Sequence, residues 1–152
     1  MPIFILEEPR GKKYQKIIEY SFMVCKAFVF SMRNDILTHY GKPSILKVLE
    51  PYKENEMEAA LYPKINCYSE DNILYFYKCN EDTKLILMGE VEGLFEWREP
   101  GPEDLTFLNN KGDVWMDSIS HERMAAIYET NRNEVEYIKN EIGLEIYWKE
   151  EV

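Results

Sequence analysis

The first 32 residues contain two kinds of apolar pattern, short continuous runs typical of strands and a series at helical spacing. Residues 3–6 are apolar and predict a short first strand or a docked arm. Residues 27–32 are rich in aromatic and β-branched side chains, which favours a buried strand. Between them an apolar series falls at helical spacing and predicts a helix over residues 12–25; it consists of Tyr14, Ile17, Ile18, Ser21, Phe22 and Cys25. A single helix continuing through residue 32 is the alternative.

The next part of the chain is more polar and is interrupted by prolines. Residues 45–49 predict a short helix, which Pro43 introduces and Pro51 stops. Residues 53–72 are polar and mixed in character, and they contain an internal proline. They predict a loop with one helical turn near residues 56–61.

A strand and a capped helix follow. Residues 73–77 are aliphatic and aromatic and predict a strand. Asn80 is placed to cap a helix over residues 81–88, whose first turn holds acids that the helix dipole favours. Gly89 or Gly93 ends this helix.

The C-terminal third alternates more regularly. Residues 94–97 predict a short strand. Residues 105–116 have the form of a β-hairpin, because the Asn/Gly-rich residues 109–112 supply the positive φ angles that such a turn needs. Residues 124–128 predict a further strand.

The last helix and strand carry clear end signals. Asn131 with Glu134 resembles a capping box, and Gly143 stands where a helix C-terminus favours glycine. Between them Val135, Ile138 and Ile142 form one apolar stripe, and residues 144–148 then alternate as in a half-buried strand. The whole pattern predicts a single α+β domain over residues 1–152, with a largely antiparallel sheet and about three to four helices.

Charge narrows the classes of partner. The chain has a net charge of −10; residues 1–53 carry a balance of +4, and residues 54–152 a balance of −14. A surface this negative repels nucleic-acid phosphates, and a basic protein is its natural electrostatic partner. Solubility alone is the other explanation for the charge.

Hydropathy and cysteine use predict a cytoplasmic protein. No run of apolar residues is long enough to span a membrane, and the first residues do not resemble a signal peptide. The three cysteines, Cys25, Cys67 and Cys79, are an odd number at wide spacing, which disfavours both disulfides and a zinc knuckle.

No catalytic motif emerges from the sequence, and neither a metal nor a cofactor is expected. Phosphate-binding loops and the G-x-S-x-G elbow are absent. Asp113, Asp117 and His121 recur every four residues, but on a strand that spacing separates them by about 13 Å, too far for one metal ion. Residues 120–122 are interpreted as a polar turn. Asp117, His121 and Glu122 remain the candidates if the protein is an enzyme.

A group of acids surrounds the aromatic residues 94–97. Acids beside aromatic side chains suit a basic, partly apolar partner. The alternative is that the tryptophan belongs to the core and the acids form a solvated edge. The predicted binding residues are Glu90, Glu92, Glu96, Trp97, Glu99, Glu103 and Asp104.

Three short motifs resemble those of a family of small uncharacterised proteins of Gram-positive bacteria, some of which are labelled stage III sporulation protein AH. They are residues 94–97 (Leu-Phe-Glu-Trp), 102–105 (Pro-Glu-Asp-Leu) and 115–122 (Trp-x-x-Ser-Ile-Ser-His-Glu), within a weaker match over residues 14–145. The resemblance implies no particular activity. In size, charge and expected location the chain is also similar to bacterial immunity proteins.

The sequence therefore leads to one functional hypothesis and two alternatives. The first is a non-catalytic binding protein, of the kind of an immunity-type inhibitor that caps a basic protein with an acidic face. The alternatives are a small cytosolic enzyme and a structural or regulatory subunit.

Overall fold

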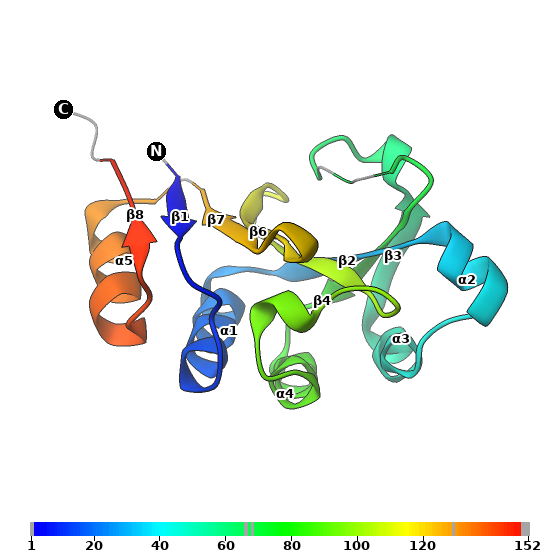
Figure 1. The fold of residues 1–152 in the computed structure, drawn as a ribbon, viewed down its shortest axis with the longest axis horizontal. Helices are drawn as coiled ribbons and strands as arrows, with labels where there is room; N and C mark the ends of the chain where they lie inside the picture. The colour runs from blue at the N-terminus through cyan, green and yellow to red at the C-terminus, as the bar shows by residue number, and fades with distance from the viewer. Residues whose placement is uncertain (1, 66, 68, 129, 150–152) are drawn as a thin grey trace.

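The strands form one antiparallel sheet, in which the first and the last strand of the chain pair with each other (Figure 1). The structure is a computed structural model and describes residues 2–65, 67, 69–128 and 130–149. Eight strands pair in the order β3-β4-β2-β5-β6-β7-β1-β8, each antiparallel to its neighbours. They are β1 (Ile3–Ile5), β2 (Ala27–Met32), β3 (Lys53–Glu58), β4 (Ile73–Lys78), β5 (Glu103–Leu108), β6 (Val114–Ile119), β7 (Met124–Ile127) and β8 (Ile146–Tyr147).

Helices cover one face of this sheet. In Figure 1, α1, α3 and α4 lie beneath the strands, and α5 lies beside β8 at one end. Five α-helices occur in the described residues, more than the three to four expected: α1 (Lys12–Val24), α2 (Asn34–Tyr40), α3 (Ser44–Leu49), α4 (Glu81–Glu90) and α5 (Arg132–Glu136). The predicted α+β class and single domain are confirmed. None of these helices combines the length and apolar character needed to cross a bilayer.

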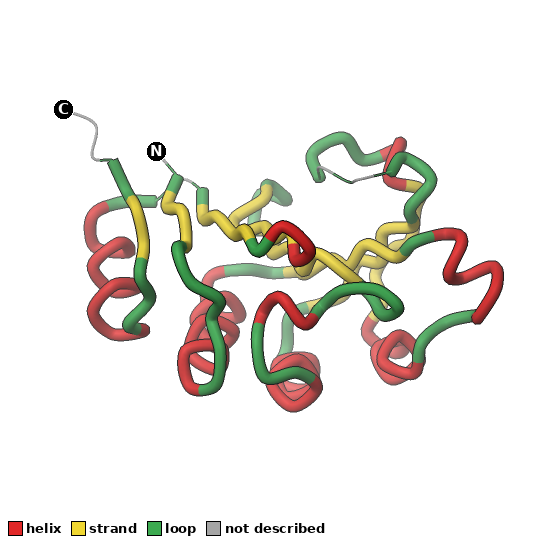
Figure 2. The backbone as a smooth tube through the Cα atoms, viewed as in Figure 1, coloured by secondary structure: helices red, strands yellow, loops and turns green. Residues whose placement is uncertain are grey.

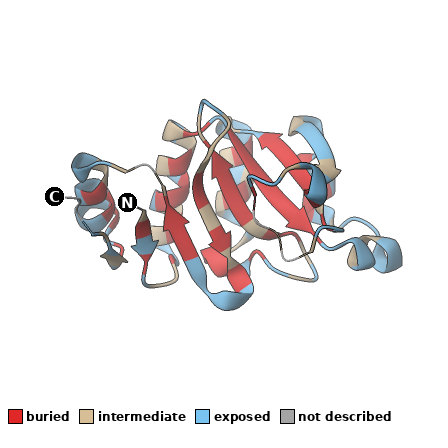
Figure 3. Cartoon of the chain, turned by 90° about the horizontal axis from the view of Figure 1, so that it is seen from above, coloured by how far each residue is buried: buried red, intermediate tan, exposed pale blue. Residues whose placement is uncertain are grey.

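The main core lies between the sheet and the helices and combines aliphatic side chains with a group of packed aromatic rings. Phe28 of β2 stacks on Tyr77 of β4, with ring centroids 5.3 Å apart. All six residues of β2 are buried (Figure 3), because its two faces enter two different clusters. This two-sided burial explains the continuous apolar run over residues 27–32. The alternative of one helix through residue 32 is wrong, since α1 ends at Val24.

The opposite face of the sheet is only partly covered. Residues 59–65 and 69–72 lie on this side of the sheet near β4 (Figure 2), and Ile65 packs in a second cluster with Val29, Leu74 and Phe76. Leu108 of β5 belongs to this second cluster, and Val114 of β6 packs against it.

Two segments differ from the prediction. Residues 53–58 form β3 rather than a loop; this strand pairs with β4 through its backbone, although its side chains are mostly exposed. The expected helical turn is limited to η2 (Ala59–Leu61). Residues 94–97 do not form a strand: η3 (Leu94–Glu96) is a 3₁₀ turn, because Leu94, Phe95 and Trp97 all enter the core and no strand could direct them to one side.

The predicted hairpin is confirmed as β5 and β6. The Asn109 side chain accepts hydrogen bonds from the backbone N–H groups of Lys111 and Asp113, at 2.9 and 3.1 Å. Gly112 has a φ of 82°, as a turn of this kind requires. The strand expected at residues 124–128 is likewise present as β7.

The end signals of both capped helices are also confirmed. The Asn80 side chain accepts from the Thr83 N–H at 2.9 Å, and Asn131 accepts from the Glu134 N–H at 2.9 Å. α5 continues into a π-helical segment, η5 (Tyr137–Ile142), which ends at Gly143 in the left-handed conformation. The final strand is shorter than the alternating pattern suggested, since β8 holds two residues.

Candidate functional site

Three potential ligand side chains meet where β5 begins. Glu103 and Asp104 are its first two residues, and His121 lies in the short 3₁₀ turn η4 (Ser120–Glu122) that follows β6. One carboxylate oxygen from each acid and one ring nitrogen of the histidine all lie within 4.8 Å of one another. We call these three residues the acid–His cluster.

A β-bulge brings the two adjacent carboxylates together. Successive side chains of a regular strand point to opposite faces. Here β2 advances by two residues, from Val29 to Ser31, while its partner β5 spans three, from Thr106 to Glu103. The extra residue on β5 is accommodated with Asp104 at a φ of 58°, in the left-handed region that few residues other than glycine adopt. The bulge therefore breaks the alternation that would otherwise separate the two acids.

The turn after β6 is fixed against the bulge by a backbone hydrogen bond. The N–H of Ser120 donates to Oδ1 of Asp104 at 2.9 Å. Arg123 closes the turn in the left-handed conformation and donates its N–H to the Ser120 carbonyl at 3.1 Å. The prediction of a polar turn over residues 120–122 is confirmed, and this turn carries His121 to the start of β5.

The four-residue spacing noticed in the sequence does not form a site. Asp113 forms an ion pair with Lys64 at 3.0 Å. Asp117 accepts the hydroxyl hydrogen of Tyr128, whose oxygen lies 3.1 and 3.0 Å from the two carboxylate oxygens. His121 instead joins acids that lie 17 and 18 positions earlier in the chain, a link that no local pattern contains.

Burial dominates the electrostatics of the cluster. Glu103 is 5% exposed, and its Oε1 has no hydrogen-bond partner among the described residues. The pKa of Glu103 is raised to about 7, first by burial and then by the charges of Asp104 and Glu99, while Arg33 and His121 oppose the shift. Burial also raises the pKa of Asp104, against the hydrogen bond from the backbone.

The cluster opens into a cavity of about 380 Å³. Arg33 faces this cavity, but its guanidinium is held by Asp35 through two hydrogen bonds of 3.1 and 2.6 Å. Asn72 donates to the buried hydroxyl of Ser31 at 3.0 Å. The cavity is lined by Arg33, Asn72, Glu99, Glu103 and His121.

Three of the other predicted binding residues, Glu90, Glu96 and Trp97, line a separate groove of about 610 Å³. Its walls come from α2, α3 and the segment 90–102, and most of its lining is apolar. We call it the α2–α3 groove. The lining residues are Ile36, Tyr40, Gly41, Pro43, Ser44, Ile45, Glu90, Val91, Glu96, Trp97, Arg98, Pro100, Gly101 and Pro102.

Trp97 belongs to the core as well as to this groove. It is 2% exposed, and its Nε1–H donates to the hydroxyl of Tyr14 at 3.1 Å. The Tyr14 hydroxyl in turn donates to the carbonyl of Leu87, in the last turn of α4, at 2.6 Å. This chain of hydrogen bonds fixes the indole beside the C-terminus of α4, where the groove begins.

The acids of the predicted face therefore divide into two groups. Glu90, Glu92 and Glu96 are exposed near the groove, whereas Glu103 and Asp104 belong to the acid–His cluster. Glu96 lies 3.4 Å from Arg10, and across the described chain neither Glu90 nor Glu92 makes an ion pair. Glu99 is half-buried, lines the cavity of the cluster and lies 3.6 Å from Arg98.

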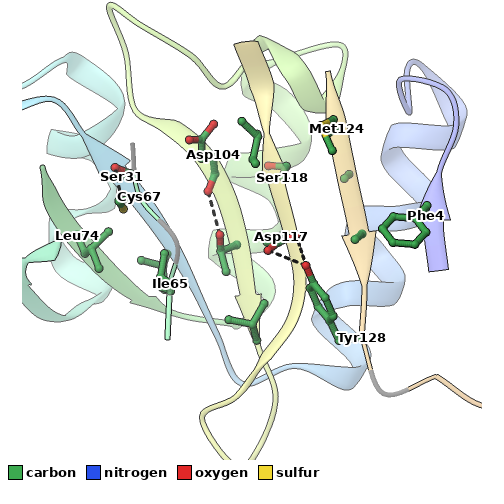
Figure 4. Close-up of a pocket in the computed structure, with 16 residues that line it drawn as sticks. Phe4, Ser31, Ile65, Cys67, Leu74, Asp104, Asp117, Ser118, Met124 and Tyr128 are labelled. Atoms are coloured by element: carbon green, nitrogen blue, oxygen red, sulfur yellow. Dashed lines mark hydrogen bonds between the residues drawn. The ribbon is translucent and has the colours of Figure 1, made fainter. Parts of the chain in front are cut away.

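A third, smaller pocket of about 150 Å³ lies on the open face of the sheet (Figure 4). Phe4 and Met124 form one side of it, and residues 65 and 67 approach from the covering segment. Asp117 and Tyr128 point into it as the hydrogen-bonded pair described above. Asp104 lines this pocket as well and so borders both the open face and the acid–His cluster.

The fold and its sites define an α+β protein with one antiparallel sheet, a mostly apolar groove and the acid–His cluster. Comparison with protein-family models, curated proteins and solved structures finds no match for this chain. The resemblance in residues 94–122 stays a prediction.

Proposed function

We propose that the protein is a non-catalytic binding protein that holds a basic, partly apolar segment of a protein partner in the α2–α3 groove. The observation that carries the proposal is the combination of apolar walls with the exposed acids Glu90 and Glu96 in the lining of the groove. An immunity-type inhibitor, which caps a basic protein, is the kind of protein that such a surface suits.

The walls of the groove supply contact area for apolar side chains. Its volume of about 610 Å³ is within the usual range for ligand sites, roughly 300–1,000 Å³. Tyr40 on α2 is 83% exposed beside it, and tyrosine is enriched among the residues that dominate binding energy at interfaces. Pro100 and Pro102 restrict the backbone of the opposite wall.

The charge around the groove selects for a basic partner. Glu90 lines the groove, and Glu92 is two residues further along the chain. Neither of them makes an ion pair within the described structure. The protein as a whole carries −10. Complementary charge of this kind accelerates association and excludes acidic partners more than it strengthens the final complex.

The test compares two synthetic peptides of equal length, one alternating Lys and Leu and the other Glu and Leu. In heteronuclear NMR titrations, the Lys/Leu peptide should shift the amides of Ile36, Tyr40 and Val91, and the Glu/Leu peptide should not. The charge-reversed double variant Glu90→Lys/Glu92→Lys should bind the Lys/Leu peptide about tenfold more weakly at low salt. The difference should fall as the Debye length shrinks from about 10 Å at 0.1 M to about 3 Å at 1 M salt.

A matched control reverses two exposed acids at the other end of the sheet. Glu136→Lys/Glu141→Lys makes the same change in net charge near α5, far from α2 and α3 in Figure 1. This control should bind the peptide nearly as well as the wild-type protein. Equal losses in both double variants, or shifts that map away from the groove, would contradict the proposal.

A further inference from the structure

The acid–His cluster contains a buried carboxyl group with an oxygen atom that makes no hydrogen bond in the described structure. Glu103 is 5% exposed, and its Oε1 has no hydrogen-bond partner in the described part of the chain. A buried charge is costly unless it is paired or coordinates a metal ion. Glu103 also lines the cavity of about 380 Å³, so this buried oxygen lies close to open space. A buried oxygen of this kind is one that a cationic ligand would satisfy.

Nearby positive charge does not fill this role. Arg33 faces the same cavity, but Asp35 already binds its guanidinium and it makes no ion pair with Glu103 among the described residues. Glu103 and Asp104 lie together in the cluster without an ion pair among the described residues, and Glu99, which lies 3.6 Å from Arg98, lines the same cavity. The local excess of negative charge favours a divalent cation over a neutral ligand.

We infer that Glu103, Asp104 and His121 bind one divalent transition-metal ion of the Zn²⁺ type, with its remaining coordination position open to the cavity. This site is separate from the α2–α3 groove and goes beyond the binding function proposed above. One imidazole with two carboxylates is a ligand set for such ions, whereas Ca²⁺ takes about six to eight oxygens. Three protein ligands with an open position are typical of accessible zinc sites rather than closed structural ones.

The geometry is close to that of a bound ion. Ligand atoms at about 2.1 Å from a tetrahedral zinc stand about 3.4 Å apart. The three ligand atoms here are all within 4.8 Å of one another, so side-chain rotations that move these atoms by about 1.4 Å or less complete the site. His121 is exposed at the mouth of the cluster, while the bulge and the Ser120 N–H hold Asp104 in place.

The experiment titrates the full-length protein with Zn²⁺ by isothermal calorimetry and with Co²⁺ by visible absorption. The wild type should bind one ion, and Co²⁺ should give tetrahedral bands without thiolate charge transfer. Glu103→Gln, Asp104→Asn and His121→Gln should each weaken binding by at least about tenfold. Asp104→Asn is the sharpest of these, because asparagine tolerates the left-handed conformation and can still accept the Ser120 N–H.

Asp113→Asn is the matched control and should bind Zn²⁺ as the wild type does, because Asp113 pairs with Lys64 outside the cluster. Thermal melts separate loss of a ligand from loss of the fold: Zn²⁺ should raise the Tm of the wild type and of Asp113→Asn, but not of the three ligand variants. Equal affinity in all five proteins, thiolate charge transfer in the Co²⁺ spectrum, or no binding would overturn the inference. The cluster would then be a histidine–carboxylate group without a metal.

Discussion

Replacing Tyr14 by phenylalanine tests the hydrogen-bonded link between α1, α4 and the groove. The Tyr14 hydroxyl is buried, donates to the Leu87 carbonyl at 2.6 Å and accepts from Trp97 Nε1 at 3.1 Å. Tyr14→Phe keeps the ring in place and creates no large cavity. It removes the hydroxyl that serves both partners and leaves a carbonyl and an indole N–H buried without their hydrogen bonds.

The expected loss follows from these two orphaned groups. A buried donor or acceptor left unsatisfied costs about 1–3 kcal/mol. Removing the buried hydroxyl also relieves its own desolvation, so the net loss in unfolding free energy should be about 2–4 kcal/mol. This is a large part of the roughly 5–15 kcal/mol by which a domain is stable. Burial raises the pKa of Tyr14, so the hydroxyl stays a donor at neutral pH.

Urea unfolding followed by far-ultraviolet circular dichroism measures this loss without depending on the fluorescence of Trp97. The midpoint should fall at an unchanged m value. Tyr20→Phe is the control on the same helix, because its hydroxyl donates at 2.7 Å to Glu134, a half-buried carboxylate that water can reach. Tyr20→Phe should cost about 1 kcal/mol or less. A Tyr14→Phe loss below about 0.5 kcal/mol, or no larger than that of the control, would refute the reasoning.

Three further outcomes are expected. Lys13 and the backbone N–H of Glu145 bond Glu7 at 2.8 and 2.7 Å and hold its pKa below the usual value. The stability lost in Glu7→Gln is therefore present above the unfolded-state pKa and should vanish in urea melts as pH falls from about 5 towards 3. Asn109→Ala should cost about 1–2 kcal/mol, because it removes the acceptor of two turn N–H groups, while exposed Asn110→Ala stays within about 0.5 kcal/mol. Reductant should leave a single thermal transition unchanged, since the three cysteines are free thiols: Cys25, Cys67 and Cys79.

The parts of the fold that the sequence predicted are those fixed by local signals. The hairpin of β5 and β6 follows from Asn109 and Gly112, whose side-chain acceptor and positive φ both act within one turn. The starts of α4 and α5 follow from Asn80 and Asn131 in the same way. Such elements need no information from the rest of the chain.

The missed elements depend on distant partners or lack a buried face. The sequence of β3 is polar because its side chains are mostly exposed, and it forms a strand only through backbone pairing with β4. α2 contains no fully buried residue, so no apolar stripe marks it. Residues 94–97 combine the composition of a strand with a 3₁₀ conformation, because the core takes three of their four side chains.

The acid–His cluster could not be predicted from local sequence, because it also depends on residues far apart in the chain. It nevertheless has features that distinguish it from the many other acids of this protein. Alternation along a strand predicts that Glu103 and Asp104 point apart, and only the mismatch between β2 and β5 brings their carboxylates together. A carboxylate buried without a partner and a non-glycine residue at positive φ are both unfavourable, and such features persist and gather at functional sites. Both occur here in adjacent residues, beside a histidine and a cavity. Glu90, Glu92 and Glu96 have no unfavourable feature of this kind, since they are exposed acids. The argument for their function depends on the groove beside them.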